Sequence, residues 1–171
     1  EGIRKAMIQH QFDPKQTAYF ANTKNFNDTA GDFGTALAQN HTPPSRVIDR
    51  AVNKLEADPG IRYLRLHLRH TNKYGVIVAA RHRADEPWHG DIWHKDSPYR
   101  HACEKDDKEL GRLVKWLEDS GRMKETVLLV CGKQGMGVKG GKDPLAPGAA
   151  ATTLVVAGAG VAGGRTFEQC E

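Results

Sequence analysis

Three lysines lie close together in a glycine-rich stretch of the chain, where their ammonium groups could bind an anion. Lys133, Lys139 and Lys142 alternate with glycines between positions 132 and 148. The backbone N–H groups of such a loop can bind an anion together with the charged side chains. No Gly-Lys-Ser or Gly-Lys-Thr ending closes the pattern, so it does not predict a P-loop. The stretch is therefore a candidate anion-binding loop, and three solvated lysines on a flexible loop are the alternative.

A second group with possible chemistry consists of His89, Asp91 and His94, which bring two imidazoles and one carboxylate within six residues. Imidazole and carboxylate groups bind zinc and copper in proteins. No further ligand is identifiable near them. Trp88 and Trp93 offer another explanation, in which they fold this segment onto the core. We expect no metal site, and these three residues are the candidate ligands if one exists.

Helices and strands alternate along the part of the chain that must position these residues. Two helices are predicted, one from an N-cap at Ser45 to the stop at Asp58-Pro59-Gly60, and one over residues 104–120, which Gly121 ends. Short strands are predicted over residues 18–21, 61–68 and 76–80. Residues 126–131 and 152–157 form apolar runs typical of buried strands. This alternation predicts an α/β layer fold.

The remaining segments are less regular. Residues 1–44 are poorly readable, with a loop over 22–34, and residues 81–103 are interpreted as an irregular insertion. The chain has 171 residues, so residues 1–171 are interpreted as a single domain or a fragment of one. Because it begins at Glu1 rather than Met, we expect it to be processed, trimmed or cut from a longer chain.

Composition excludes several classes of protein. With 39% hydrophobic and 27% charged residues, the chain does not have the composition of a disordered protein. No apolar run is long enough to predict a transmembrane segment. The net charge is +4, but the basic residues are dispersed and no RNA-binding or zinc-finger motif accompanies them, so nucleic acid is not an expected partner. Cys103, Cys131 and Cys170 are too scattered for a disulfide scaffold or a zinc site.

An ordered set of motifs resembles one family. Its parts are Asp49-Arg50-Ala51-Val52-Asn53-Lys54-Leu55, Tyr63-Leu64-Arg65-Leu66-His67-Leu68, Leu110-Gly111-Arg112-Leu113 with Ser120-Gly121, Glu125-Thr126-Val127-Leu128-Leu129-Val130 and Thr153-Leu154-Val155-Val156-Ala157-Gly158. Over residues 45–165 this order is similar to sulfatases of the alkaline phosphatase superfamily. The resemblance implies a three-layer α/β/α fold with a mostly parallel sheet. It also implies a location outside the cytoplasm, which nothing else in the sequence indicates.

The chemical positions depart from that family. Sulfatases hold a divalent cation at a Ser-Asp-His-Gly or Ser-Asp-Asn-Gly turn, and here the corresponding turn is Gly132-Lys133-Gln134-Gly135. The Lys133 ammonium repels a cation and has no lone pair to offer, while Gln134 stands where the His or Asn would be. Lys142 matches a family lysine that contacts the sulfate. His70-Thr71-Asn72 stands near the position of a family Asp-x-His.

The nucleophile signature of the family, Cys or Ser followed by x-Pro-x-Arg, is absent. Thr42-Pro43-Pro44-Ser45-Arg46 fits the threonine form found in some phosphodiesterases of the superfamily, so Thr42 is a candidate nucleophile. The alternative is a proline-marked helix start capped by Ser45.

These observations favour a sulfatase-like domain that has lost metal-dependent ester hydrolysis, needs no cofactor, and binds an anionic ligand or another protein chain. One alternative is part of an active sulfatase or phosphodiesterase with calcium or magnesium, whose metal and nucleophile residues lie outside this chain. Another is a basic binding module unrelated to the family. If the chain is sulfatase-like, we expect the loop after the 126–131 strand to lie at the C-terminal edge of the sheet.

Overall fold

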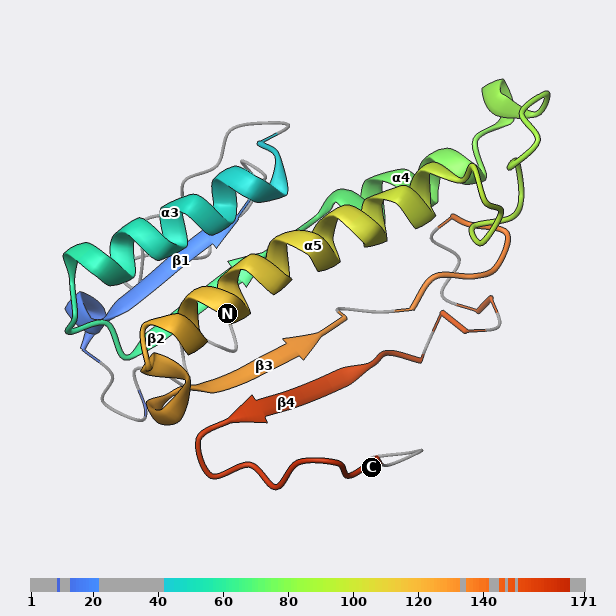
Figure 1. The fold of residues 1–171 in the computed structure, drawn as a ribbon. Helices are drawn as coiled ribbons and strands as arrows, with labels where there is room; N and C mark the ends of the chain where they lie inside the picture. The colour runs from blue at the N-terminus through green and yellow to red at the C-terminus, as the bar shows by residue number, and fades with distance from the viewer. Residues whose placement is uncertain are drawn as a thin grey trace.

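The computed structural model describes residue 9 and residues 13–21, 42–132, 135–141, 145–146, 148–149 and 151–166. These residues form a mixed α/β arrangement (Figure 1). The main elements are β1 (Thr17–Ala21), α3 (Pro44–Ala57), β2 (Tyr63–His67), α4 (His70–Val78), α5 (Pro98–Asp119), β3 (Val127–Cys131) and β4 (Leu154–Gly158). Short 3-10 helices also occur, namely η1 (Pro14–Gln16), η4 (Arg81–Arg83) and η5 (Arg122–Glu125). None of the helices described is long and apolar enough to cross a membrane.

A parallel strand pair with one covering helix forms the first half of the fold. β1 and β2 pair in register from Thr17 with Tyr63 to Ala21 with His67, which confirms the expected strands in these two places. α3 precedes β2 in the chain and lies over the pair in Figure 1. Its buried face is apolar at helical spacing, and Val47 and Ala51 form a core cluster with Ala18 and Phe20.

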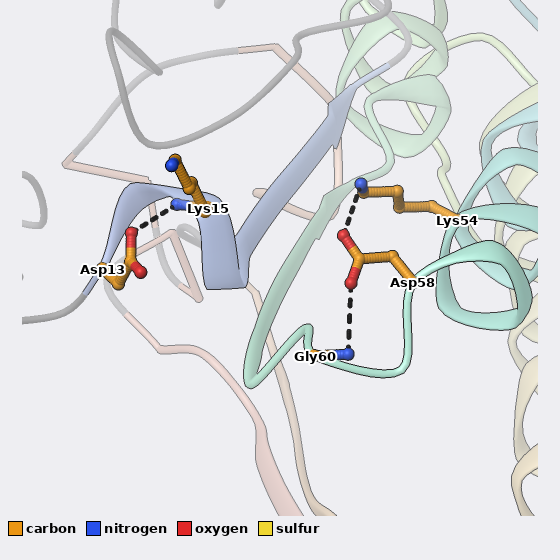
Figure 2. A network of polar contacts seen from close by, with 5 residues as sticks. All are labelled: Asp13, Lys15, Lys54, Asp58 and Gly60. Carbon is orange, nitrogen blue, oxygen red and sulfur yellow. Dashed lines mark hydrogen bonds and ion pairs between the residues drawn. The ribbon is translucent and has the colours of Figure 1, made fainter.

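A short polar network closes the turn between α3 and β2 (Figure 2). Lys54 Nζ donates to the Asp58 carboxylate at 2.9 Å, and the Gly60 backbone N–H donates to the same carboxylate at 3.1 Å. The hydrogen bond from Lys54 holds the pKa of Asp58 below its usual value. Before β1, at η1, the Lys15 backbone N–H donates to the Asp13 carboxylate in a similar turn. The predicted stop of α3 at Asp58-Pro59-Gly60 is confirmed, since α3 ends at Ala57.

The start of α3 differs from the prediction. The helix begins at Pro44 with Pro43 as its N-cap, and no side chain caps it, so the assignment of Ser45 as the N-cap was wrong. Pro44 has no N–H to satisfy and a fixed φ suited to the first helical turn, so a hydroxyl cap is not required.

α5 is the longest of the described helices and begins earlier than expected. The buried Ser97 is its N-cap, with its side chain accepting from Tyr99 N–H, and Pro98 occupies the first turn. Residues 98–103 are therefore helical and do not belong to an irregular insertion. The apolar residues of this helix recur at helical spacing, and Leu113 and Leu117 pack with Ile48 of α3.

The strand predicted over residues 76–80 is wrong, because residues 70–78 form helix α4. Helix α4 packs antiparallel to the N-terminal half of α5, with His70 near Asp106 and Gly75 near Tyr99. Gly75 and Val78 are buried there. The apolar run was too short to distinguish a strand from a helix, and packing against α5 decided between them.

β3 and β4 pair antiparallel, from Val127 with Gly158 to Cys131 with Leu154. The two strands were correctly predicted, but their exposure to solvent was not. Val127, Leu129, Leu154, Val155 and Val156 are exposed, so the prediction of buried strands was wrong. Among the described residues, the sheets are one parallel pair and one antiparallel pair.

Candidate functional site

The loop that carries the lysines follows β3 and approaches helix α4. In Figure 1, β3 points in the same direction as β1, and the described parts of the loop lie on the side of α4 and the 81–97 segment. β2 leads directly into α4, since His67 ends the strand and His70 begins the helix. The carboxyl ends of β2 and β3 therefore both lead into the region around α4.

Backbone hydrogen bonds fix the described part of this loop on α4. Gly141 N–H donates to the carbonyl of Gly75 at 3.0 Å. Ile92 N–H, from the segment between α4 and α5, donates to the carbonyl of Val138 at 2.9 Å. Met136 covers Gly75 so closely that a Cβ at that position would lie 2.5 Å from the Met136 methyl carbon. The loop, α4 and the 81–97 segment thus form one connected structure.

The predicted lysine cluster is only partly described. Lys133, Gln134 and Lys142 lie outside the described residues. Lys139 is exposed in a turn, and no ion pair joins it to another described residue. Its charge is therefore open to solvent beside α4, as an anion-binding residue requires.

A polar cluster between α4 and α5 was not predicted as a site. His70 Nδ1 lies 3.8 Å from Asp106 Oδ1, and both side chains are largely buried. The Tyr99 hydroxyl and the Cys103 thiol are hydrogen-bonded to each other one turn away on α5. His70, which stands near the position of the family Asp-x-His, is the first residue of α4 and packs on α5.

Burial dominates the electrostatics of this cluster. It raises the pKa of Asp106 to about 6 and that of Tyr99 to about 12, and it also raises the pKa of the Cys103 thiol. A thiol with a raised pKa is a poor nucleophile at neutral pH, because the thiolate is the reactive form. The sequence signal that could have revealed this cluster is the spacing of Asp106, Leu110 and Leu113. It places a carboxylate on the apolar face of α5.

The structure does not bring His89, Asp91 and His94 together as a metal-binding set. No group of three or more histidine, cysteine, aspartate or glutamate side chains suited to a metal occurs in the part of the chain that the structure describes. Asp91 accepts from the Trp93 backbone N–H at 2.9 Å, and His94 Nδ1 accepts from Asp96 N–H at 3.2 Å. Both side chains thus stabilise local turns.

The alternative explanation, in which Trp88 and Trp93 fold this segment onto the core, is only partly correct. Trp93 is 58% exposed and packs edge-on against Tyr99, with 5.7 Å between ring centroids. Ile92, at 1% exposed, is the residue that anchors the segment to the core.

Thr42, the candidate nucleophile, lies just before α3 and is only 6% exposed. A nucleophile must be reached by its substrate, and a threonine this buried offers little surface to one. A separate groove of about 470 Å³ lies between α3 and α5. There the Arg112 guanidinium pairs with Asp49 at 2.6 Å, and the Trp116 indole N–H donates to Glu56 at 3.0 Å. These polar groups of the groove already satisfy one another.

Comparison of the sequence with known protein families, and with curated proteins, found no match to either.

Proposed function

We propose that this chain is a sulfatase-like domain that binds an anion through its glycine-rich loop and does not hydrolyse esters with a metal. The proposal includes the three-layer α/β/α architecture of sulfatases for the complete fold. The observation that carries it is the composition of the loop after β3. Residues 132–142 contain three lysines and no carboxylate, where the sulfatases have a metal-binding aspartate.

The order of the elements supports this proposal. The segments that resemble the family motifs coincide with α3, β2, the end of α5, β3 and β4. The loop follows the carboxyl end of β3, the side on which open α/β folds bind ligands. Lys139 is exposed there, and the loop is held against α4 by backbone hydrogen bonds. A loop held in this way, with the exposed ammonium group of Lys139, is suited to an anion such as sulfate or phosphate.

The electrostatics argue against a cation at the same place. Two unit charges 4 Å apart interact by about 4 kcal/mol at an effective dielectric of 20. Exchanging an aspartate for a lysine changes the sign of this contribution from attraction to repulsion. Gln134 offers only a neutral carbonyl oxygen as a ligand.

The first test combines metal analysis of the purified protein with an arylsulfate hydrolysis assay. We expect neither bound calcium or magnesium nor turnover. Stoichiometric calcium or magnesium, together with hydrolysis that a chelator abolishes, would contradict the proposal and support the active sulfatase or phosphodiesterase alternative.

The second test measures sulfate binding by calorimetry in the wild type and in Lys133→Ala, Lys139→Ala and Lys142→Ala variants. Exposed ion contacts are worth up to about 1 kcal/mol, so each variant should bind sulfate a few-fold more weakly. Lys124→Ala is the matched control, because it removes an exposed lysine from η5, away from the loop. Equal weakening in all four variants would indicate a general charge effect and contradict a site in the loop.

A further inference from the structure

The Asp106 carboxyl is buried between α4 and α5 without full hydrogen bonding. Its side chain is 13% exposed, and Oδ1 has no hydrogen-bond partner among the described residues. His70 Nδ1 lies 3.8 Å from Oδ1, beyond hydrogen-bond range. An ionised carboxylate in such a position is unfavourable, because burial removes its hydration and no described residue gives Oδ1 a donor in return.

The described groups that face this carboxyl include few charges. From α4 it is faced by His70 and by the backbone N–H of Thr71, which donates toward it. Lys73, one turn along α4, lies 5.6 Å from the centre of the Tyr74 ring. On α5 the neighbouring titratable group is Cys103, which is bonded to Tyr99. Asp49 of α3 forms an ion pair with Arg112 of α5. At a rise of 1.5 Å per residue, Arg112 lies about 9 Å along the helix axis from Asp106.

The protonation state of Asp106 therefore affects the stability of the fold. Burial raises its pKa to about 6, from the value of 3.8 that it has when exposed, and the Thr71 N–H offsets only part of this. A carboxyl whose pKa is higher in the folded state stabilises the fold when it is protonated. This contribution is complete below about pH 4 and is lost as the pH rises through about 6.

We propose that Asp106 makes the packing of α4 on α5 sensitive to pH: the neutral carboxyl is tolerated in this buried position, and its ionisation loosens the contact of the N-terminal turn of α4 with α5. The effect extends to the loop, because Gly75 of α4 accepts the hydrogen bond from Gly141 and is covered by Met136. Acidification thus tightens the support of the loop on α4. This pH sensitivity is independent of the proposed anion binding, because it concerns only the packing of α4 on α5.

The test compares urea unfolding of the wild type with an Asp106→Asn variant at pH 5 and pH 7. The amide of asparagine keeps the shape and the acceptor but does not ionise. Between pH 5 and pH 7 we expect the folded-to-unfolded ratio of the wild type to fall about fivefold more than that of Asp106→Asn. The partial exposure of the Asp106 side chain keeps this difference below the value for full burial. At pH 7 the variant should be the more stable protein. Asp107→Asn is the matched control, because it removes the same charge from the exposed neighbouring position.

A second readout locates the effect within the fold. Hydrogen exchange of the α4 amides, corrected for the intrinsic pH dependence, should become faster between pH 5 and pH 7 in the wild type and not in Asp106→Asn. The proposal is overturned if Asp106→Asn and Asp107→Asn have the same pH dependence as the wild type. It is also overturned if His70→Gln abolishes the pH dependence while Asp106→Asn preserves it, because His70 would then be the titrating group.

Discussion

Gly121 ends α5 in a conformation that other residues adopt only with strain. Its φ is 74°, in the left-handed region, and it follows the last helical turn at Ser120. Gly111, inside the same helix, is exposed, and a methyl group at its Cα would have open space around it. The two glycines therefore have opposite effects on stability, one by allowing a turn and the other by weakening a helix.

The expected result of alanine substitution follows at each position. Gly121→Ala should destabilise the fold by about 1 kcal/mol, because alanine is strained at positive φ although space is available for it. Gly111→Ala should stabilise it by up to about 1 kcal/mol through helix propensity. Thermal unfolding measures both, and each kcal/mol shifts the Tm of a domain of this size by about 2–4 °C. Shifts of the same sign would contradict this account.

At the scale of elements, the β3–β4 ribbon has an uncovered apolar face. Residues that pair directly in an antiparallel sheet point to the same side, so Val127, Leu129 and Cys131 share a face with Val156 and Leu154. All five are exposed, and Leu129 is 61% exposed. Leu128 and Val130, on the opposite face, are half-buried. A two-stranded ribbon with one apolar face in water is prone to associate with other chains.

Threonine substitutions distinguish the two faces of β3. Leu129→Thr should reduce aggregation and the binding of a hydrophobic dye, with a change in the free energy of unfolding within about 0.5 kcal/mol. Leu128→Thr should destabilise the fold by about 1 kcal/mol, because it removes partly buried apolar surface. Light scattering during heating, together with urea unfolding, tests the pair. Equal effects on unfolding would mean that the faces are not different.

At the scale of the whole molecule, the loop after β3 is held by a close approach of two backbones. Gly140 has φ 77°, and a Cβ at this position would lie 2.5 Å from the carbonyl oxygen of Gly75 in α4. Since that atom belongs to a helix backbone, it cannot move aside as a flexible side chain does. Gly160, in the turn after β4, has φ 72° but open space around it.

Alanine at these two glycines separates backbone strain from loop docking. Both variants have the strain of a positive φ, about 1–2 kcal/mol. Only Gly140→Ala should release the loop from α4, so that exchange of the Gly141 amide and proteolytic cleavage within residues 132–148 become faster. If Gly160→Ala accelerated both to the same extent, the close contact with Gly75 would not be what holds the loop.

The sequence by itself determined the elements whose signals are local. α3, β2 and the C-terminal part of α5 were predictable because apolar residues recur at the right period and Asp58-Pro59-Gly60 or Gly121 ends each helix. The chemical character of the loop was also visible in its lysines and glycines. These features depend on a few neighbouring residues, so they can be recognised without knowledge of the rest of the fold.

Only the tertiary structure decided what lies against what. Residues 76–78 became part of a helix because α5 offers them a packing surface, and β4 runs antiparallel to β3 because of long-range pairing. His94 was directed into a local turn, whereas Asp106 was buried beside His70, which lies far from it in the sequence. Burial and proximity arise from contacts between distant segments, and a local pattern of residue types does not specify them.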